Sequence, residues 1–185
     1  MRHCLAVTGL IIAGFASPTF ADTATPGHSY ESCSMITSEY VTVLQLASRG
    51  LSGEVLKNTL PGLSEKAEER IDALLRVVGT DGLVDTYSTV NSEYARCAAG
   101  VFESNGMPSQ GSREAHFHFC AGENKVRYEV LLAALIGAPK EKVLAQLQPR
   151  HHEAATAIYD LHQAEGELAV FDSLGAELKY CLKGY

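Results

Sequence analysis

The chain contains two stretches that match one another around their cysteines. ESCSMITSEYVTVLQLASRG (31–50) and HFCAGENKVRYEVLLAALIG (118–137) each place a glycine 17 residues after the cysteine. Further matches follow in the same order, including a valine–leucine pair, a proline six residues after that valine, and an aromatic residue ten positions before a second cysteine. Ordered self-similarity of this kind predicts a tandem duplication, with copies at about residues 30–100 and 117–185.

Within each copy, apolar residues recur at steps of three and four, which is the period of an amphipathic helix. The face predicted to be buried in the first helix consists of Cys33, Ile36, Tyr40, Val43, Leu44 and Ala47. Gly50 is a natural end for that helix, and Ser52, Ser64 and Asp81 are candidate N-caps for the next three. We therefore expect an all-α fold of two tandem, disulfide-stapled repeats, with about four helices each in an up-down, bundle-like arrangement.

Four cysteines follow the first 21 residues, namely Cys33, Cys97, Cys120 and Cys181. An even number of cysteines in an exported chain predicts disulfides, and four cysteines allow three connectivities. Each copy starts its first helix with a cysteine and finishes its fourth with one, and these two ends lie together in a four-helix bundle. We expect the pairs Cys33–Cys97 and Cys120–Cys181, while swapped pairing between the repeats stays open.

Residues 1–21 have the three parts of a secretory signal peptide. A short basic start precedes an apolar run from Leu5, and Thr19-Phe20-Ala21 gives a small-x-small site for cleavage after Ala21; cleavage after Ala16 is the alternative. The apolar run is too short to cross roughly 30 Å of hydrocarbon. We expect a periplasmic or secreted protein with no membrane span in the mature chain.

The mature chain divides into a first repeat with its N-terminal lead (22–101), a linker (102–116) and a second repeat (117–185). The linker is polar and rich in glycine, serine and proline, a composition typical of connecting segments. This composition favours two lobes, and a single fused bundle is the alternative.

Charge and motifs exclude several functions. A formal net charge of −7 argues against binding to nucleic acid or to anionic membranes. The chain lacks the G-x-S-x-G elbow, the phosphate-binding glycine loops and the H-E-x-x-H zinc motif. Because disulfide formation also removes the cysteines as nucleophiles, we expect neither an enzyme nor a bound cofactor. A catalytic site assembled between two lobes is a weaker third option.

Two sets of residues remain as candidate sites, both in the second repeat or directly before it. Imidazoles ligate zinc and copper, and the candidate metal ligands are His116, His118, His151 and His152. Solvated side chains near helix starts are the more ordinary interpretation of these histidines. Tyrosine is enriched at the centres of protein interfaces, and the candidates for a partner surface are Tyr159, Tyr180 and Tyr185.

The leading hypothesis is an exported protein-binding module, such as an inhibitor or an immunity-type protein that neutralises an enzyme. Its partner would be another periplasmic or secreted protein, and an acidic surface suits a basic target. The alternative is a periplasmic protein that binds a metal or a small ligand through the histidines of the second repeat.

Overall fold

The computed structural model describes residues 28–60 and 62–184, and its regular elements in this part are all helical. The all-α prediction is therefore confirmed. The helices are α1 (Tyr30–Ser48), α2 (Gly53–Thr59), α3 (Glu65–Asp81), α4 (Leu83–Asn105), α5 (Arg113–Leu135), α6 (Lys140–Leu144), a 3₁₀ turn η1 (Pro149–His151), α7 (His152–Glu165) and α8 (Glu167–Lys183).

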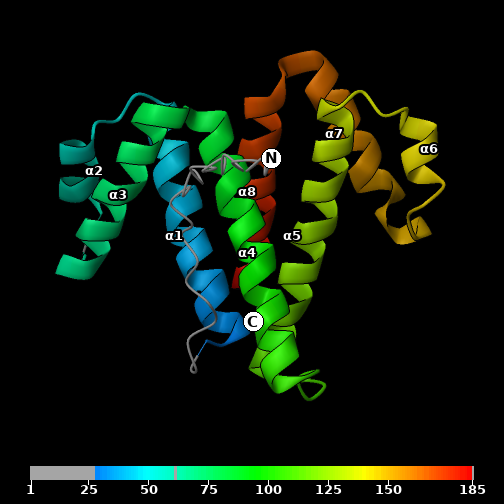
Figure 1. The fold of residues 1–185 in the computed structure, drawn as a ribbon, viewed down its shortest axis with the longest axis horizontal. Helices are drawn as coiled ribbons and strands as arrows, with labels where there is room; N and C mark the ends of the chain where they lie inside the picture. Colours follow the sequence, from blue (N-terminus) through cyan, green and yellow to red (C-terminus); the bar gives the residue numbers. More distant parts are fainter. Residues whose placement is uncertain (1–27, 61, 185) are drawn as a thin grey trace, which may run out of the picture.

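The four long helices α1, α4, α5 and α8 lie side by side, while α2 and α3 extend from one side and α6 and α7 from the other (Figure 1). One continuous hydrophobic core joins the two halves of the sequence. Its buried members include Leu44 and Tyr87 from the first half and Tyr128 and Phe171 from the second. The halves thus share a core in a single bundle, and they do not form the two lobes that the linker composition favoured.

The connection between the halves is shorter than the expected linker at 102–116. Helix α4 continues to Asn105, because Val101 is buried against the core and extends its apolar face. Helix α5 already begins at Arg113, where the Ser112 hydroxyl accepts a hydrogen bond from the Ala115 amide at 3.1 Å. The short connection keeps α4 and α5 in direct contact.

The local capping signals were correct at two of three helix starts. Ser52 and Ser64 cap α2 and α3 through their side chains. The prediction for Asp81 was wrong, since Asp81 is the last residue of α3 and Gly82, with a φ of 87°, starts α4 without a side-chain cap. Glycine adopts that φ without the steric penalty that a side chain imposes. Ile36 was predicted to lie on the buried face of the first helix, and this was wrong, since its side chain is 37% exposed.

Two disulfides fasten the bundle near the same end, where α1 and α5 begin and α4 and α8 finish (Figure 1), and they confirm the expected pairs. Cys33 is joined to Cys97 and Cys120 to Cys181, with Cα–Cα distances of 5.9 and 5.8 Å. Each bond links the start of one long helix to another long helix of the same half. No helix in the described part of the chain is long and apolar enough to span a membrane. The predicted signal segment lies outside the described residues.

Polar contacts also fix α8 and α5 against the first half. The Tyr87 hydroxyl donates to Asp172 Oδ1 at 2.7 Å, and burial together with this carboxylate raises the pKa of Tyr87 above its ordinary value. The Asn124 amide donates to Asn91 Oδ1 at 2.9 Å, and both side chains are buried. These paired groups fix the register between the halves, because an unpaired buried amide is costly.

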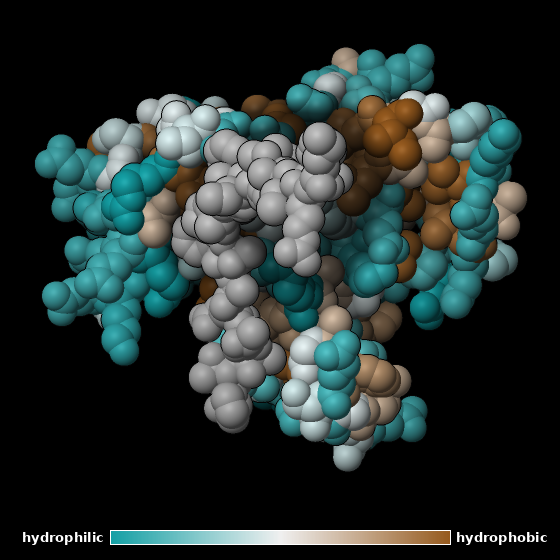
Figure 2. Space-filling model, viewed as in Figure 1, coloured by the Kyte–Doolittle hydropathy of each residue, from teal (hydrophilic) through white to brown (hydrophobic). Residues whose placement is uncertain are grey.

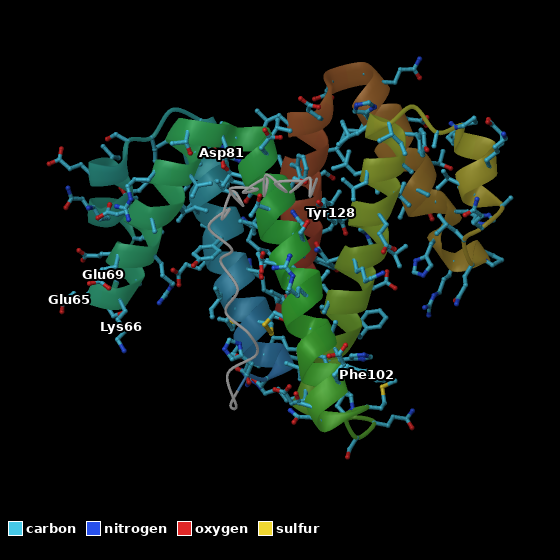
Figure 3. All side chains as sticks on the ribbon, viewed as in Figure 1. Glu65, Lys66, Glu69, Asp81, Phe102 and Tyr128 are labelled. Atoms are coloured by element: carbon cyan, nitrogen blue, oxygen red, sulfur yellow. A yellow bond between two sulfur atoms is a disulfide. The ribbon has the colours of Figure 1, made fainter. Side chains whose placement is uncertain are left out.

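The surface is uneven in character. Figure 2 shows a largely hydrophilic surface over α2 and α3, whereas hydrophobic surface gathers over the upper part of the side that carries α5 and α7. In Figure 3, Glu65, Lys66 and Glu69 extend outward from the free end of α3, while Tyr128 lies among the long helices. On the face shown, the more apolar surface therefore belongs to the second half.

Candidate functional site

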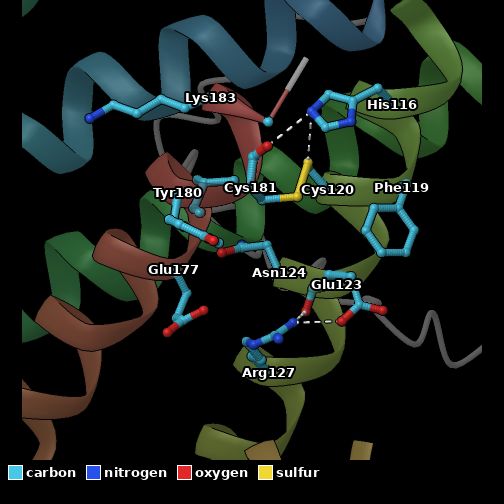
Figure 4. Close-up of a pocket in the computed structure, with 12 residues that line it drawn as sticks. His116, Phe119, Cys120, Glu123, Asn124, Arg127, Glu177, Tyr180, Cys181 and Lys183 are labelled. Atoms are coloured by element: carbon cyan, nitrogen blue, oxygen red, sulfur yellow. Dashed lines mark hydrogen bonds and ion pairs between the residues drawn. A yellow bond between two sulfur atoms is a disulfide. The ribbon is translucent and has the colours of Figure 1, made fainter. Parts of the chain in front are cut away.

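A groove lies between α5 and α8, over the Cys120–Cys181 disulfide (Figure 4). Its volume is about 520 Å³, which is within the range of ligand pockets. The residues that line the groove include His116, Phe119, Glu123, Arg127, Glu177 and Tyr180.

The disulfide sets the shape of this groove. It ties the first turns of α5 to the last turn of α8, so the two helices stay together at their exposed ends. His116 adds a second tie, since its Nε2 lies 2.9 Å from the carbonyl oxygen of Cys181. A carbonyl oxygen only accepts hydrogen bonds, so Nε2 carries the proton. The groove is thus built on a rigid end of the bundle.

Two aromatic side chains stand exposed at this groove. Tyr180 on α8 is 80% exposed and Phe119 on α5 is 52% exposed, and the disulfide lies between their two helices (Figure 4). Large aromatic rings at the surface favour contact with another molecule, because covering them removes apolar area from water. This pair is the strongest indication of a binding surface in the described chain.

Charged groups lie beside the aromatics. Arg127 donates to Glu123 Oε2 at 2.7 Å, and both side chains are mostly buried. Glu177 is exposed and forms no ion pair with any residue from 28 to 60 or from 62 to 184. It is therefore the carboxylate of the groove that is available to a cation from a partner.

A second, smaller groove of about 350 Å³ continues from the first between α7 and α8, and the two share Arg127 and Glu177. Beside it, the Nε of Arg150 donates to His151 Nε2 at 3.1 Å. His151 is buried, and its Nδ1 is 3.8 Å from Glu123 Oε2. Polar contacts therefore connect the Arg127–Glu123 pair under the first groove to the start of α7.

The four candidate metal ligands occupy different environments. His118 packs edge-on against Tyr30, and His152 Nε2 lies 3.2 Å from the Leu147 carbonyl oxygen. His116 and His151 have the partners given above. Within the described residues, the group of three possible ligand atoms that do lie close together belongs to His28, Cys33 and Cys97. A metal site formed by the four second-repeat histidines stays a prediction.

The three candidate tyrosines also differ. Tyr180 is more exposed than Tyr159. Tyr159 is half-buried; its hydroxyl donates to the Ala138 carbonyl oxygen at 2.9 Å, and burial followed by the charge of Glu141 raises the pKa of Tyr159. Tyr185 lies outside the described residues. The contribution of Phe119 was missed, although the run H-F-H-F-C places it directly before Cys120.

No protein-family model, curated protein or solved structure matches this chain.

Proposed function

We propose that this chain is an exported protein-binding module, and that its partner binds over the groove between α5 and α8. The single observation that carries the proposal is the exposed pair of Phe119 and Tyr180 on a disulfide-fastened groove. Tyrosine and phenylalanine are enriched at interface centres, and a rigid platform lowers the entropy lost on binding. Two disulfides are typical of a compartment outside the cytoplasm, such as the periplasm.

The chemistry of the groove suits a basic partner. Glu177 lines the groove with Tyr180 and forms no ion pair within the described residues, and the whole chain carries a net charge of −7. Opposite charge on a partner would accelerate association and set its orientation. An inhibitor or immunity-type protein acting on a basic periplasmic or secreted enzyme fits this combination.

Tandem duplication with later divergence of the two copies is part of the proposal. Both halves have a long helix, then a short one, then two further helices, with a 3₁₀ turn added before α7 in the second half. Counting from the matched cysteines, Phe119 and Tyr180 correspond to Ser32 and Arg96 in the first copy. The aromatic pair therefore occurs in one copy, which supports a role specific to the second.

A comparative pull-down from periplasmic and secreted fractions tests the proposal. Immobilised chain should retain a partner at physiological salt, and Tyr180→Ala or Phe119→Ala should weaken binding about tenfold or more, as is typical of interface hot spots. The matched control is Ile136→Ala, because Ile136 is 84% exposed but lies outside both grooves. Failure to retain any partner, or equal binding by all three variants, would contradict the proposal.

A further inference from the structure

His28 lies beside the Cys33–Cys97 disulfide, which belongs to the first half of the chain. His28 immediately precedes the Ser29 N-cap of α1, and its Nδ1 is 3.6 Å from Cys97 Sγ. The Nδ1 atom and the two sulfurs all lie within 4.8 Å of one another. Cys33 is buried, while Cys97 and His28 are half-buried, so the cluster is protected but reachable from solvent.

The second disulfide has a histidine as well, but in a different arrangement. Nε2 of His116 lies 3.7 Å from Cys120 Sγ, and the same nitrogen must carry a proton because it donates to the Cys181 carbonyl oxygen. Binding a metal through Nε2 of His116 would break that hydrogen bond. Among the described residues, Nδ1 of His28 contacts Cys97 Sγ, so binding a metal through Nδ1 breaks no hydrogen bond to an oxygen of these residues.

We infer that reduction of the Cys33–Cys97 disulfide creates a zinc site from Cys33, Cys97 and His28. A dithiol reductant gives two electrons and two protons to the disulfide, which yields two cysteine thiols and the oxidised reductant. Zn²⁺ then displaces the two thiol protons and binds two thiolates and the neutral imidazole. In the reverse direction a disulfide oxidant takes two electrons from the two thiolates and is itself reduced to a dithiol, so the Cys33–Cys97 bond forms again and the ion is released. Zinc binding is thus controlled by redox state.

The distances match this ligand set. Tetrahedral zinc with Zn–S bonds of about 2.3 Å and a Zn–N bond of about 2.0 Å sets each nitrogen–sulfur pair roughly 3.5 Å apart. His28 Nδ1 and Cys97 Sγ are already 3.6 Å apart. The two sulfurs must separate to roughly 3.8 Å, and the Cα–Cα distance of 5.9 Å lets rotation of the side chains provide this separation. The fourth position is left for water.

Two histidine variants that keep every cysteine provide a matched test. The purified chain is reduced with excess dithiol, desalted without oxygen and titrated with Zn²⁺ against a chromophoric chelator. Co²⁺ serves as a second probe, because thiolate ligation gives a charge-transfer absorption. The reduced chain should bind one tight Zn²⁺, His28→Ala should weaken that binding about tenfold or more, and His116→Ala should leave it unchanged. A Cys33→Ser/Cys97→Ser variant should lose the thiolate–cobalt absorption.

Thermal unfolding followed by circular dichroism covers the case in which reduction loosens the fold. Zinc that binds the folded site should raise the unfolding temperature of the reduced chain, or restore its helix content, and should not do so for His28→Ala. The inference is overturned by equal zinc binding to the oxidised chain, by equal binding to both histidine variants, or by a reduced chain that neither binds zinc tightly nor is stabilised by it.

Discussion

Gly175 lies where α8 passes close to α1, and its replacement by alanine tests how tightly the two halves are packed. A Cβ at this position would overlap with Val41 Cγ1 and would lie 3.0 Å from Gln45 Nε2. Valine has little rotational freedom in a helix, so the contact with Val41 requires the helices to separate. The Gln45 side chain would also have to move away from the Asp172 carbonyl oxygen, to which it donates at 2.8 Å.

The expected change in the free energy of unfolding combines two destabilising effects and one stabilising effect. Overpacking costs about 1–3 kcal/mol, and loss of the Gln45 hydrogen bond costs about 1 kcal/mol. Replacing glycine by alanine inside a helix contributes about 1 kcal/mol in the opposite direction. Gly175→Ala should therefore lower the free energy of unfolding by about 1–3 kcal/mol.

Urea unfolding followed by far-ultraviolet circular dichroism measures this difference, and Gly122→Ala is the matched control. Gly122 is also helical, but a Cβ there would meet nothing within 4 Å. The control should be stabilised by about 0.5–1 kcal/mol through helix propensity alone. Adding Val41→Ala to Gly175→Ala should remove the clash, so the two changes should be non-additive by about 1 kcal/mol. Equal stabilisation by Gly175→Ala and Gly122→Ala would refute the reasoning.

Two further predictions concern stability. Burial raises the pKa of Tyr94 to about 12, although its hydrogen bond with Ser34 opposes the rise. Because the pKa of Tyr94 is higher in the folded chain than in the unfolded chain, the protonated hydroxyl contributes fully to the unfolding free energy below about pH 10. This contribution is lost as the pH rises toward about 12. Unfolding free energies measured across that range should fall less steeply for Tyr94→Phe, and an identical decline would exclude Tyr94 as the cause. Replacing Cys120 and Cys181 by serine should cost about 4 kcal/mol in unfolding free energy, since the bond closes a long loop. Urea unfolding without reductant measures this cost, and a loss below about 1 kcal/mol would contradict the entropic account.

Several features of the candidate sites were accessible from the sequence. Tyr180 could be singled out because it stands outside the core positions that the two copies share. Phe119 could not, since a phenylalanine within a helical pattern is read as core unless the neighbouring helices are placed. His28 was also invisible as part of a cluster, because it is 69 residues from Cys97.

The sequence by itself determined the helical class, the caps at Ser52 and Ser64, and the two cysteine pairs. The helical class and the caps depend on periodicity and on side chains a few residues apart, and the cysteine pairs depend on matched positions in the two copies. Relations of both kinds can be observed directly in the sequence. Only the tertiary structure decided that the halves share one core. That outcome follows from the close approach at Gly175 and from the Tyr87–Asp172 and Asn91–Asn124 contacts. Such contacts join residues far apart in sequence, so no local pattern specifies them, and the position of the groove depends on the packing they fix.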